Sequence, residues 1–212
     1  EVNGAPDSTI YRGNIWSFTV EPYAYPVQPL RATASGYQAG MDPNKTIDGS
    51  GLTGDLHGTV ETTMWMSIGV QPAWIQYEFD RVYQLHELHV WNANQLIETF
   101  LGFGAKSVTI ETSVDGTTWA PVADVPEFAR APGLDNYAAN TTVRLGDVEA
   151  KYVKLTIHSN WGGVAPQVGL SEVRFTYVPL QARAPQPADG ATGIGMDATL
   201  NWRPGRAAAS HQ

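Results

Sequence analysis

The sequence contains no cysteine among its 212 residues. Disulfide bonds, zinc sites built on thiolates and cysteine nucleophiles are therefore excluded. Basic side chains are also scarce: 13 Lys and Arg stand against 21 Asp and Glu, which gives a formal net charge of −8 at pH 7. Nucleic acids and anionic lipids are bound through clustered basic side chains, so neither is an expected partner. An acidic chain is compatible with cations and neutral polar ligands.

Long apolar runs are missing as well. No stretch reaches about 18 consecutive apolar residues, the length that a membrane-spanning helix needs, and no signal peptide is visible. The abrupt start at EVNGAPDSTIY is typical of an excised or processed fragment. Hydrophobic residues make up 42% of the chain, enough for a sizeable core. The absence of disulfides fits a secreted protein of bacterial rather than animal origin.

Strand-like alternation runs through the chain, and no amphipathic helix of normal length is predicted. Ile75, Tyr77 and Phe79 alternate with polar residues in WIQYEF, as expected for a strand with one buried face. The same period of two occurs in SVTIETS (107–113), YVKLTIHS (152–159) and EVRFTYV (172–178). Asp115-Gly116 between two strand-like runs predicts a hairpin. These patterns predict an all-β sandwich or barrel.

Two proline-rich segments divide the chain. Residues 21–29 and 178–190 are predicted to be extended linkers, because proline fixes φ and removes a hydrogen-bond donor. The resulting pieces are residues 1–23, 24–179 and 180–212, of which only the second is long enough for a complete domain. The first resembles the last strand of an immunoglobulin- or fibronectin-III-like module. The third resembles the start of another, with Leu200 and Trp202 facing inward.

Each partial module would expose an unpaired strand edge. We hypothesise that the two partial modules either stay disordered or pair with each other, within one chain or between chains.

One long loop concentrates carboxylates, hydroxyls and a histidine: NKTIDGSGLTGDLHGTVETTMW, residues 44–65. It is too polar and too rich in glycine for a core strand, and it has no helical period. Gly49 and Gly51 would let its backbone turn tightly. A metal ion, another ligand or plain solvation each explain this composition, and Asp48 by itself would also suit the cap of a turn.

Five segments, in order, resemble the discoidin or coagulation factor 5/8 type C domain, whose bacterial relatives include carbohydrate-binding modules of the galactose-binding-like group. They are KTIDGS followed by TTMW, AWIQYEFDRVYQLHELHVW, VTIETSVDGTTWAPV, AKYVKLTI and GLSEVRFTYV. The resemblance covers residues 30–178 and implies an eight-stranded antiparallel jelly-roll β-sandwich, with short β extensions at both ends of this chain. The loop between Asp48 and Trp65 is longer than is usual in the family.

The resemblance also implies a structural calcium ion beside this loop. Calcium takes about 6–8 oxygen ligands and mixes carboxylates with backbone carbonyls. Carried over by position, the ligands would be the carbonyls of Lys45, Ser50 and Ser171, the carboxylates of Asp48 and Glu172, and Thr63. Asp55 is a further candidate in the lengthened loop.

The carbohydrate-binding relatives bind sugars in a shallow site on neighbouring loops, with a histidine, an asparagine, an arginine and an aromatic ring. An exposed ring stacks on the apolar face of a sugar while amides and carboxylates bond its hydroxyls. The ligand-binding candidates here are His57, Asn92, Asn94, Glu98, Phe103, Asn160 and Trp161. No arginine follows Asn94, which argues against a specific preference for galactose or fucose.

The remaining aromatic and histidine residues are assigned structural roles. Trp65, Trp74 and Trp119 are expected to pack at core or hairpin positions, and Trp91 to plug the end of the sandwich. HELH (86–89) is one residue short of the zinc-protease motif and falls on a strand, where its two histidines point to opposite faces.

The sequence thus predicts a non-catalytic carbohydrate-binding module of a larger secreted or surface-anchored bacterial protein, flanked by immunoglobulin-like modules and bound to a glycan or polysaccharide. A protein- or cell-surface adhesion module and a purely structural spacer are the alternatives. An enzyme is not expected. The Asp48 and Glu172 carboxylates could imitate a glycosidase pair, but a bridging calcium explains them more simply.

Overall fold

The computed structural model describes residues 15–17 and 20–206. Most of the strand predicted near the start of the chain, together with residues 207–212, lies outside the described residues. Helices in the described part are short: η1 (Pro43–Thr46), η2 (Glu61–Thr63) and α1 (Glu98–Leu101). None of these could cross a membrane.

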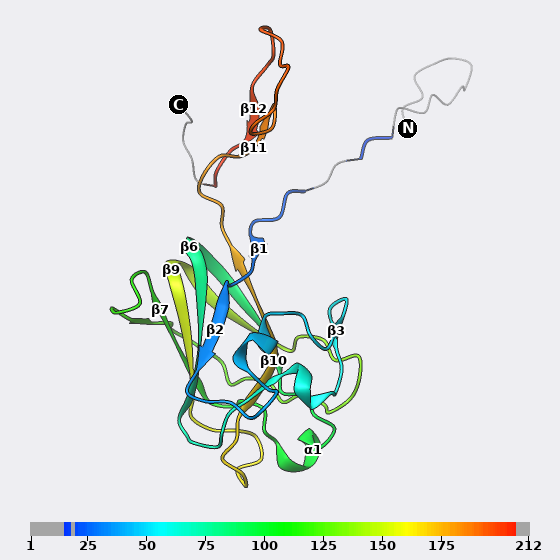
Figure 1. Ribbon diagram of the computed structural model, residues 1–212, viewed down its shortest axis with the longest axis vertical. Coiled ribbons are helices and arrows are strands. Elements are labelled where there is room, and N and C mark those ends of the chain that lie inside the picture. Colours follow the sequence, from blue (N-terminus) through cyan, green and yellow to red (C-terminus); the bar gives the residue numbers. More distant parts are fainter. Residues whose placement is uncertain (1–14, 18–19, 207–212) are drawn as a thin grey trace, which may run out of the picture.

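Eight antiparallel strands form the main sheet system (Figure 1). In chain order they are β1 (Tyr25–Val27), β2 (Arg31–Ala34), β5 (Trp65–Met66), β6 (Ala73–Asn92), β7 (Val108–Ser113), β8 (Ala120–Pro121), β9 (Thr141–Ile157) and β10 (Gly169–Tyr177). The strand order is β1-β10-β6-β9-β7-β8, with β2 paired to β6 and β5 to β10.

The two long strands β6 and β9 belong to both layers of a sandwich. The first half of β6 pairs with β2 and with the end of β9, and its second half pairs with β10 and with the start of β9. The register breaks between Glu78 and Tyr83, where the strands turn from one layer into the other. This arrangement confirms the predicted antiparallel β-sandwich.

The predicted alternation places the expected side chains in the core. Ile75, Tyr77 and Phe79 are fully buried, and Phe175 from β10 contacts both rings edge-on, with centroids 5.4 Å from Tyr77 and 5.2 Å from Phe79. Burying one large apolar side chain contributes about 1.5–3 kcal/mol. The predicted hairpin is also present: Asp115 accepts hydrogen bonds from the backbone N–H groups of Thr117 and Thr118 in the turn between β7 and β8.

Of the three tryptophans expected to pack at core or hairpin positions, only one lies in the core. Trp65 is fully buried, and its Nε1 donates to the Gly36 carbonyl at 3.2 Å. Trp74 and Trp119 do not enter the core; they are partly exposed on the outer face, where Lys154 Nζ lies 5.8 Å from the centre of each ring. Trp74 precedes buried Ile75, so strand alternation turns it outward.

Both proline-rich segments contain strands, which corrects their prediction as plain linkers. β1 lies within residues 21–29 and pairs with β10 from Tyr25 opposite Tyr177. An edge strand tolerates Pro26 because one side of it makes no ladder hydrogen bonds. After β10, the chain forms a two-stranded ribbon of β11 (Arg183–Gln186) and β12 (Asn201–Arg203).

Leu200 and Trp202 do not face inward in this ribbon. Their exposed fractions are 70% and 47%. The described part of the ribbon has only two strands.

A single carboxylate joins the two flanks of the domain. Glu21 accepts from the Tyr25 hydroxyl at 2.5 Å and is paired with the guanidinium of Arg183. Nitrogen atoms of Arg203 and Arg206 lie 3.7 and 3.5 Å from the same carboxylate. We call these five residues the Glu21 clasp. In the described part of the chain the flanks therefore meet through side chains.

Candidate functional site

Three loops meet at the end of the sandwich opposite the Glu21 clasp (Figure 1). They are residues 93–107, which include α1, residues 127–140 and residues 158–168; together they are called the loop end. An isolated antiparallel bridge joins Ala105 in the first loop to Asn160 in the third. The Phe128 N–H in the second loop donates to the Lys106 carbonyl in the first at 3.0 Å. Because the loops are linked to one another, their outer surfaces are continuous.

Backbone packing holds the third loop against α1. The Gly162 N–H donates to the Gly102 carbonyl at 2.8 Å. A Cβ added to Gly162 would lie 1.6 Å from the Leu101 carbonyl oxygen, far inside van der Waals contact. A residue without a side chain is therefore required at this crossing.

Three predicted ligand-binding asparagines lie inside the loop end. Asn92 and Asn94 are fully buried and Asn160 is 5% exposed. Each side-chain Nδ2 donates to two backbone carbonyls, at 2.6–3.0 Å, and each Oδ1 accepts a backbone N–H. The carbonyls belong to Ala105 and Ala129 for Asn92, Gly58 and Leu134 for Asn94, and Ala165 and Gln167 for Asn160. These amides fix the loops from beneath their surface.

Glu98 has a similar place at the start of α1. Its fully buried carboxylate accepts from Phe103 N at 2.9 Å and from Gly104 N at 3.1 Å, and Arg130 Nε lies 3.8 Å away. Burial raises the pKa of Glu98 to about 7, although both backbone donors and Arg130 oppose the rise. The side chain closes the turn after α1.

His57, the predicted histidine of a sugar site, is also fully buried. It belongs to β4 (Leu56–His57), which forms a small hairpin with β3 (Leu52–Thr53). Its backbone exchanges two hydrogen bonds with Tyr137, at 2.8 and 3.1 Å, and its Nδ1 lies 2.8 Å from the Gly58 carbonyl oxygen. Its Nε2 is buried without a hydrogen-bond partner among the described residues.

The predicted calcium loop brings two carboxylates together. Glu172 on β10 is 3% exposed, and one of its carboxylate oxygens is buried without a hydrogen-bond partner in the described part of the chain. Burial raises the pKa of Glu172 to about 8; nearby Asp48 adds to the rise, while Arg174 and the Gly49 N–H oppose it. A buried carboxylate with an unpaired oxygen beside another carboxylate is an environment that a cation would stabilise.

Hydroxyl groups lie close to this pair along the same loop. Ser50 donates its N–H to Asp48 at 2.8 Å and its hydroxyl to the Thr63 carbonyl at 3.3 Å. A Cβ on Gly51 would lie 2.5 Å from Thr63 Oγ1 and 2.6 Å from His57 Nε2, so the backbone passes tightly between these side chains. Gly51 has a φ of +82°, which glycine adopts without strain.

The other predicted ligands are less informative. Lys45 Nζ lies 3.4 Å from Asp48, and the Ser171 hydroxyl accepts from Asn94 N at 3.2 Å. Asp55 does not join the set, because its exposed carboxylate pairs with Arg174 at 2.6 Å. Within the described residues, no three His, Cys, Asp or Glu side chains are grouped to hold a metal. The predicted ligands would offer an ion two carboxylates together with hydroxyl and carbonyl oxygens, a set that suits calcium rather than a transition metal.

The two predicted aromatic ligands are partly buried. Trp161 donates its Nε1 to the Phe128 carbonyl at 2.9 Å, and Lys106 Nζ lies 4.8 Å from the ring centre. Phe103 packs against a buried cluster of Met41, Met64, Met66 and Ala93. Trp91 is 4% exposed and closes the interior, as expected.

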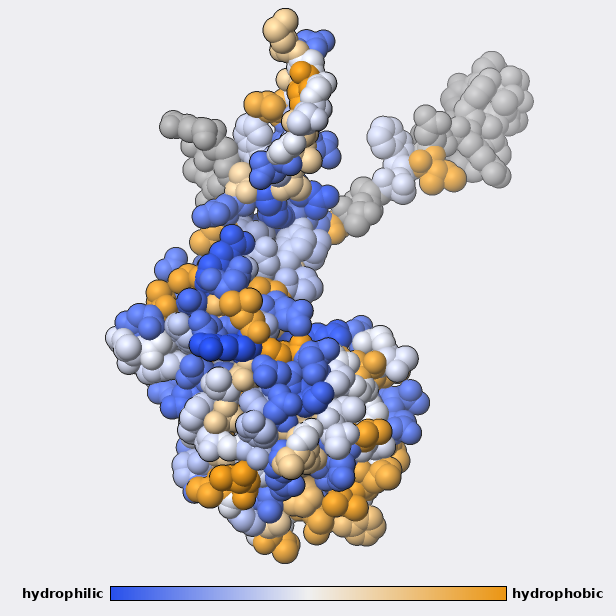
Figure 2. Space-filling model, viewed as in Figure 1, coloured by the Kyte–Doolittle hydropathy of each residue, from blue (hydrophilic) through white to orange (hydrophobic). Residues whose placement is uncertain are grey.

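Sequence reasoning missed the most exposed aromatic ring of the loop end. Phe100 on α1 is 82% exposed, and the neighbouring loops expose Leu96, Leu134 and Val164 by 69%, 63% and 81%. Figure 2 shows hydrophobic side chains gathered at this lower end of the molecule. Apolar residues in LIETFLGFG, a segment without strand alternation, were the available signal.

The solved structures similar to this chain include two bacterial modules. A carbohydrate-binding module of family 32, the third in a family 31 glycoside hydrolase from Clostridium perfringens, is 17% identical with a TM-score of 0.50, over 71% of this chain and 90% of that one. The family 32 module of C. perfringens NanJ, in complex with galactose, is 14% identical with a TM-score of 0.50, over 69% and 92%. At these identities the likeness shows the fold alone.

A whole enzyme matches only in part. This chain spans 14% of the length of a C. perfringens family 89 glycoside hydrolase, at 18% identity and a TM-score of 0.48 over 68% of this chain. Among curated proteins, none matches the sequence closely enough to count as a relative. The F5/8 type C domain family, in contrast, matches residues 31–173. Because that match covers most of the sequence and the sandwich has the expected form, the chain belongs to the F5/8 type C domain family.

Proposed function

We propose that this chain is a non-catalytic carbohydrate-binding module that binds a glycan at the loop end, within a larger secreted or surface protein of a bacterium. The exposed Phe100 ring carries this proposal. It projects from a loop whose backbone is fixed by Asn94 and Glu98, so little conformational entropy is lost when a sugar stacks on it. Similar folds named as carbohydrate-binding modules, one of them in complex with galactose, support this choice.

The residues predicted from the sequence take two roles in this proposal. Trp161 and Phe103 lie on the same loops and contribute partly exposed aromatic surface. Asn92, Asn94, Glu98, Asn160 and His57 contribute from below, by fixing the loops that carry the contact surface. The site is shallow, so binding to one glycan end is expected to be weak and to be strengthened by repeated modules.

A glycan-array screen of this chain, in calcium and in chelator, tests the proposal. We expect binding to a defined glycan that Phe100→Ala weakens by about tenfold or more, equivalent to about 1.4 kcal/mol. Tyr23→Ala is the matched control, because Tyr23 is an exposed aromatic residue (53%) near the opposite end. A blank array from folded protein, or equal losses in the two variants, would exclude glycan binding at the loop end.

We also propose that a structural calcium ion lies beside Asp48 and Glu172, with Thr63 and the carbonyls of Lys45, Ser50 and Ser171 completing its ligands. The buried unpaired oxygen of Glu172 supports this assignment. The ion would neutralise the two carboxylates and tie the loop before β5 to strand β10, without taking part in any reaction.

Adhesion to a protein or cell surface is the second candidate function, and the apolar side chains of the loop end favour it. Leu96, Phe100, Leu134 and Val164 expose more apolar surface than a sugar site needs. A blank glycan array combined with saturable binding to bacterial or host surface protein, lost in Phe100→Ala, would select this alternative.

A further inference from the structure

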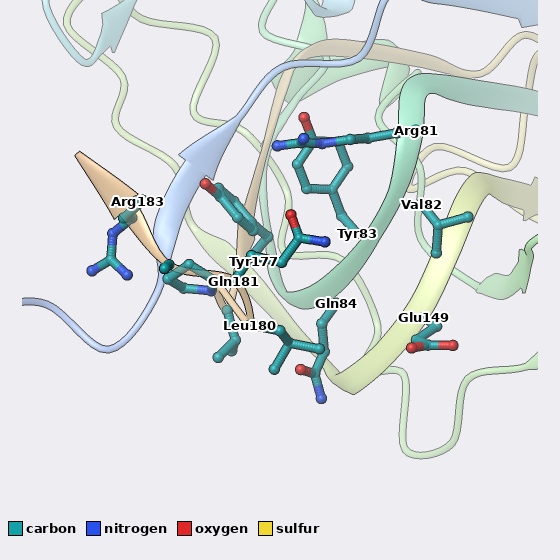
Figure 3. A pocket seen from close by; sticks show the side chains of 12 residues that line it. Arg81, Val82, Tyr83, Gln84, Glu149, Tyr177, Leu180, Gln181 and Arg183 are labelled. Carbon is teal, nitrogen blue, oxygen red and sulfur yellow. The ribbon is translucent and has the colours of Figure 1, made fainter. Parts of the chain in front are cut away.

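The ribbon of β11 and β12 has little packing against the sandwich. Every side chain from Leu180 to Pro204 is exposed except those of Arg183 and Pro187, so burial of apolar side chains does not fix the position of the ribbon. The segment that leads to the ribbon passes beside the corner of β6 and β9, and a cavity of about 390 Å³ lies between the two (Figure 3). Polar contacts must therefore hold the ribbon in place.

The end of the ribbon returns to the point where the ribbon begins. The Arg206 N–H donates to the Pro179 carbonyl at 2.7 Å. A Cβ added to Gly205 would lie 1.8 Å from the Leu180 carbonyl oxygen, so the two backbones are in direct contact. The described chain therefore leaves the ribbon beside the end of β10.

The segment that enters the domain lies at the same place. Arg206 Nη2 donates to the Pro22 carbonyl at 2.6 Å. The Tyr23 hydroxyl donates to Asp147 of β9 at 2.9 Å, and the Tyr23 ring meets His86 of β6 edge-on, with centroids 5.0 Å apart. The entering segment is thus attached both to the sandwich and to the end of the ribbon.

Glu21 joins these segments through its charge. Its carboxylate faces the guanidiniums of Arg183, Arg203 and Arg206. The Tyr25 hydroxyl of β1 donates to the same carboxylate at 2.5 Å, and the Arg183 guanidinium carbon lies 4.7 Å from the Tyr25 ring centre. The hydrogen bond from Tyr25 and the three guanidiniums lower the pKa of Glu21 despite the opposing effect of desolvation, so the carboxylate is charged at neutral pH.

The balance of charge makes Glu21 the critical residue of the clasp. One carboxylate faces three guanidiniums, which leaves a surplus of positive charge. If Glu21 were neutral, the guanidiniums would only repel one another. Removing Arg203 alone, in contrast, keeps two attractive pairs and reduces this repulsion. The clasp therefore depends on one carboxylate rather than on the number of its ion pairs.

We propose that the Glu21 clasp is a conformational lock. It holds the ribbon in one orientation against the sandwich and keeps the entering and leaving segments of the chain side by side. The loop end lies at the opposite end of the sandwich (Figure 1), so the lock directs the loop end away from both flanks. When Glu21 is neutralised, the ribbon pivots about the segment after β10. This inference goes beyond the proposed function and does not depend on what the loop end binds.

Distances between two spin labels, measured by pulsed electron spin resonance, test the lock. The chain has no native cysteine, so Thr192→Cys in the ribbon and Ala120→Cys on β8, both at exposed positions, can be labelled selectively. We expect a single narrow distance distribution when the clasp is intact. Glu21→Gln should broaden this distribution by about twofold or more, because several orientations become populated. Arg203→Gln should broaden it much less.

Glu149→Gln is the matched control, because it removes an exposed carboxylate that borders the cavity but lies outside the clasp. The amide NMR signals of the sandwich core should keep their positions in Glu21→Gln, which shows that the domain itself stays folded. A broad distribution with the clasp intact, an equally narrow one in Glu21→Gln, or the same broadening in Glu149→Gln would overturn the lock. Equal broadening in Arg203→Gln and Glu21→Gln would overturn its dependence on a single carboxylate.

Discussion

Removing one oxygen atom from Tyr137 should measurably weaken the whole domain. The Tyr137 hydroxyl, on a side chain 5% exposed, accepts a hydrogen bond from the backbone N–H of Asn92 at 3.0 Å and donates to Asn140 at 2.6 Å. Asn92 is fully buried at the end of β6, so no water replaces the lost acceptor. Asn140 is exposed and can bond water instead.

The expected cost follows from this asymmetry. A buried donor left without a partner costs about 1–3 kcal/mol, and for a domain of this size each kcal/mol lowers Tm by about 2–4 °C. The Tyr137 backbone should stay in place in Tyr137→Phe, because its N–H and C=O remain bonded to His57. Local exchange of the Asn92 amide proton should also become faster.

Urea unfolding measures the effect, with Tyr77→Phe as the matched control. Thr46 donates its hydroxyl hydrogen to the Pro43 carbonyl at 2.7 Å, so the Tyr77 hydroxyl, 3.1 Å from Thr46 Oγ1, must be the donor of their shared hydrogen bond. Its removal leaves only an acceptor lone pair empty. We expect Tyr137→Phe to lose about 1 kcal/mol more than Tyr77→Phe at an unchanged m-value. Equal losses would refute the role given to the Asn92 N–H.

Three further predictions concern pH, packing and calcium. The pKa of Glu98 is raised from 4.5 to about 7 in the folded state, so its stabilising contribution is complete below pH 4.5 and is lost as the pH rises through 7. At about 1.4 kcal/mol per pKa unit, the free energy of unfolding falls by about 3 kcal/mol over this range. Glu98→Gln should flatten this part of the pH–stability curve measured by urea unfolding. Gly162→Ala should lower stability by about 1–3 kcal/mol or more, because its Cβ meets the Leu101 carbonyl, and a Tm within 1–2 °C of wild type would contradict this contact. Calcium at about 100 times its Kd should add about 2.7 kcal/mol to the free energy of unfolding and raise Tm by about 5–10 °C. Chelator should reverse this rise, and Glu172→Gln should abolish it. An unchanged Tm in wild type would exclude the calcium site.

The sequence predicts the sandwich because side chains two residues apart in a strand point to the same face. Val153, Leu155 and Ile157 alternate in the chain and are all fully buried on β9. The same local rule does not decide what the outward positions do. Trp74 is large and apolar, yet the alternation of side chains along β6 places it on the outward face, outside the core.

The candidate site is less predictable because its residues act over long sequence distances. Asn94 occurs in a polar loop, which suggested exposure, but its partners Gly58 and Leu134 are 36 and 40 residues away. The exposure of Phe100 depends on how α1 packs against Gly162. Neither of these long-range contacts produces a periodic pattern in the sequence. Side-chain type alone therefore predicts a polar surface at the loop end and misses its exposed apolar residues.

The antiparallel pairing of β1 with β10 has a mechanical consequence. The chain enters the sheet at Tyr25 and leaves it at the opposing Tyr177, so both flanks depart from the same end. Tension applied to the flanks would peel these strands apart one residue pair at a time, which is the weak direction for a β-ladder. The ion pair of Glu21 with Arg183, in the Glu21 clasp, lies outside the first strand pair and would bear the load before that pair does. The loop end lies outside this path, so its surface would keep its shape while the chain is stretched.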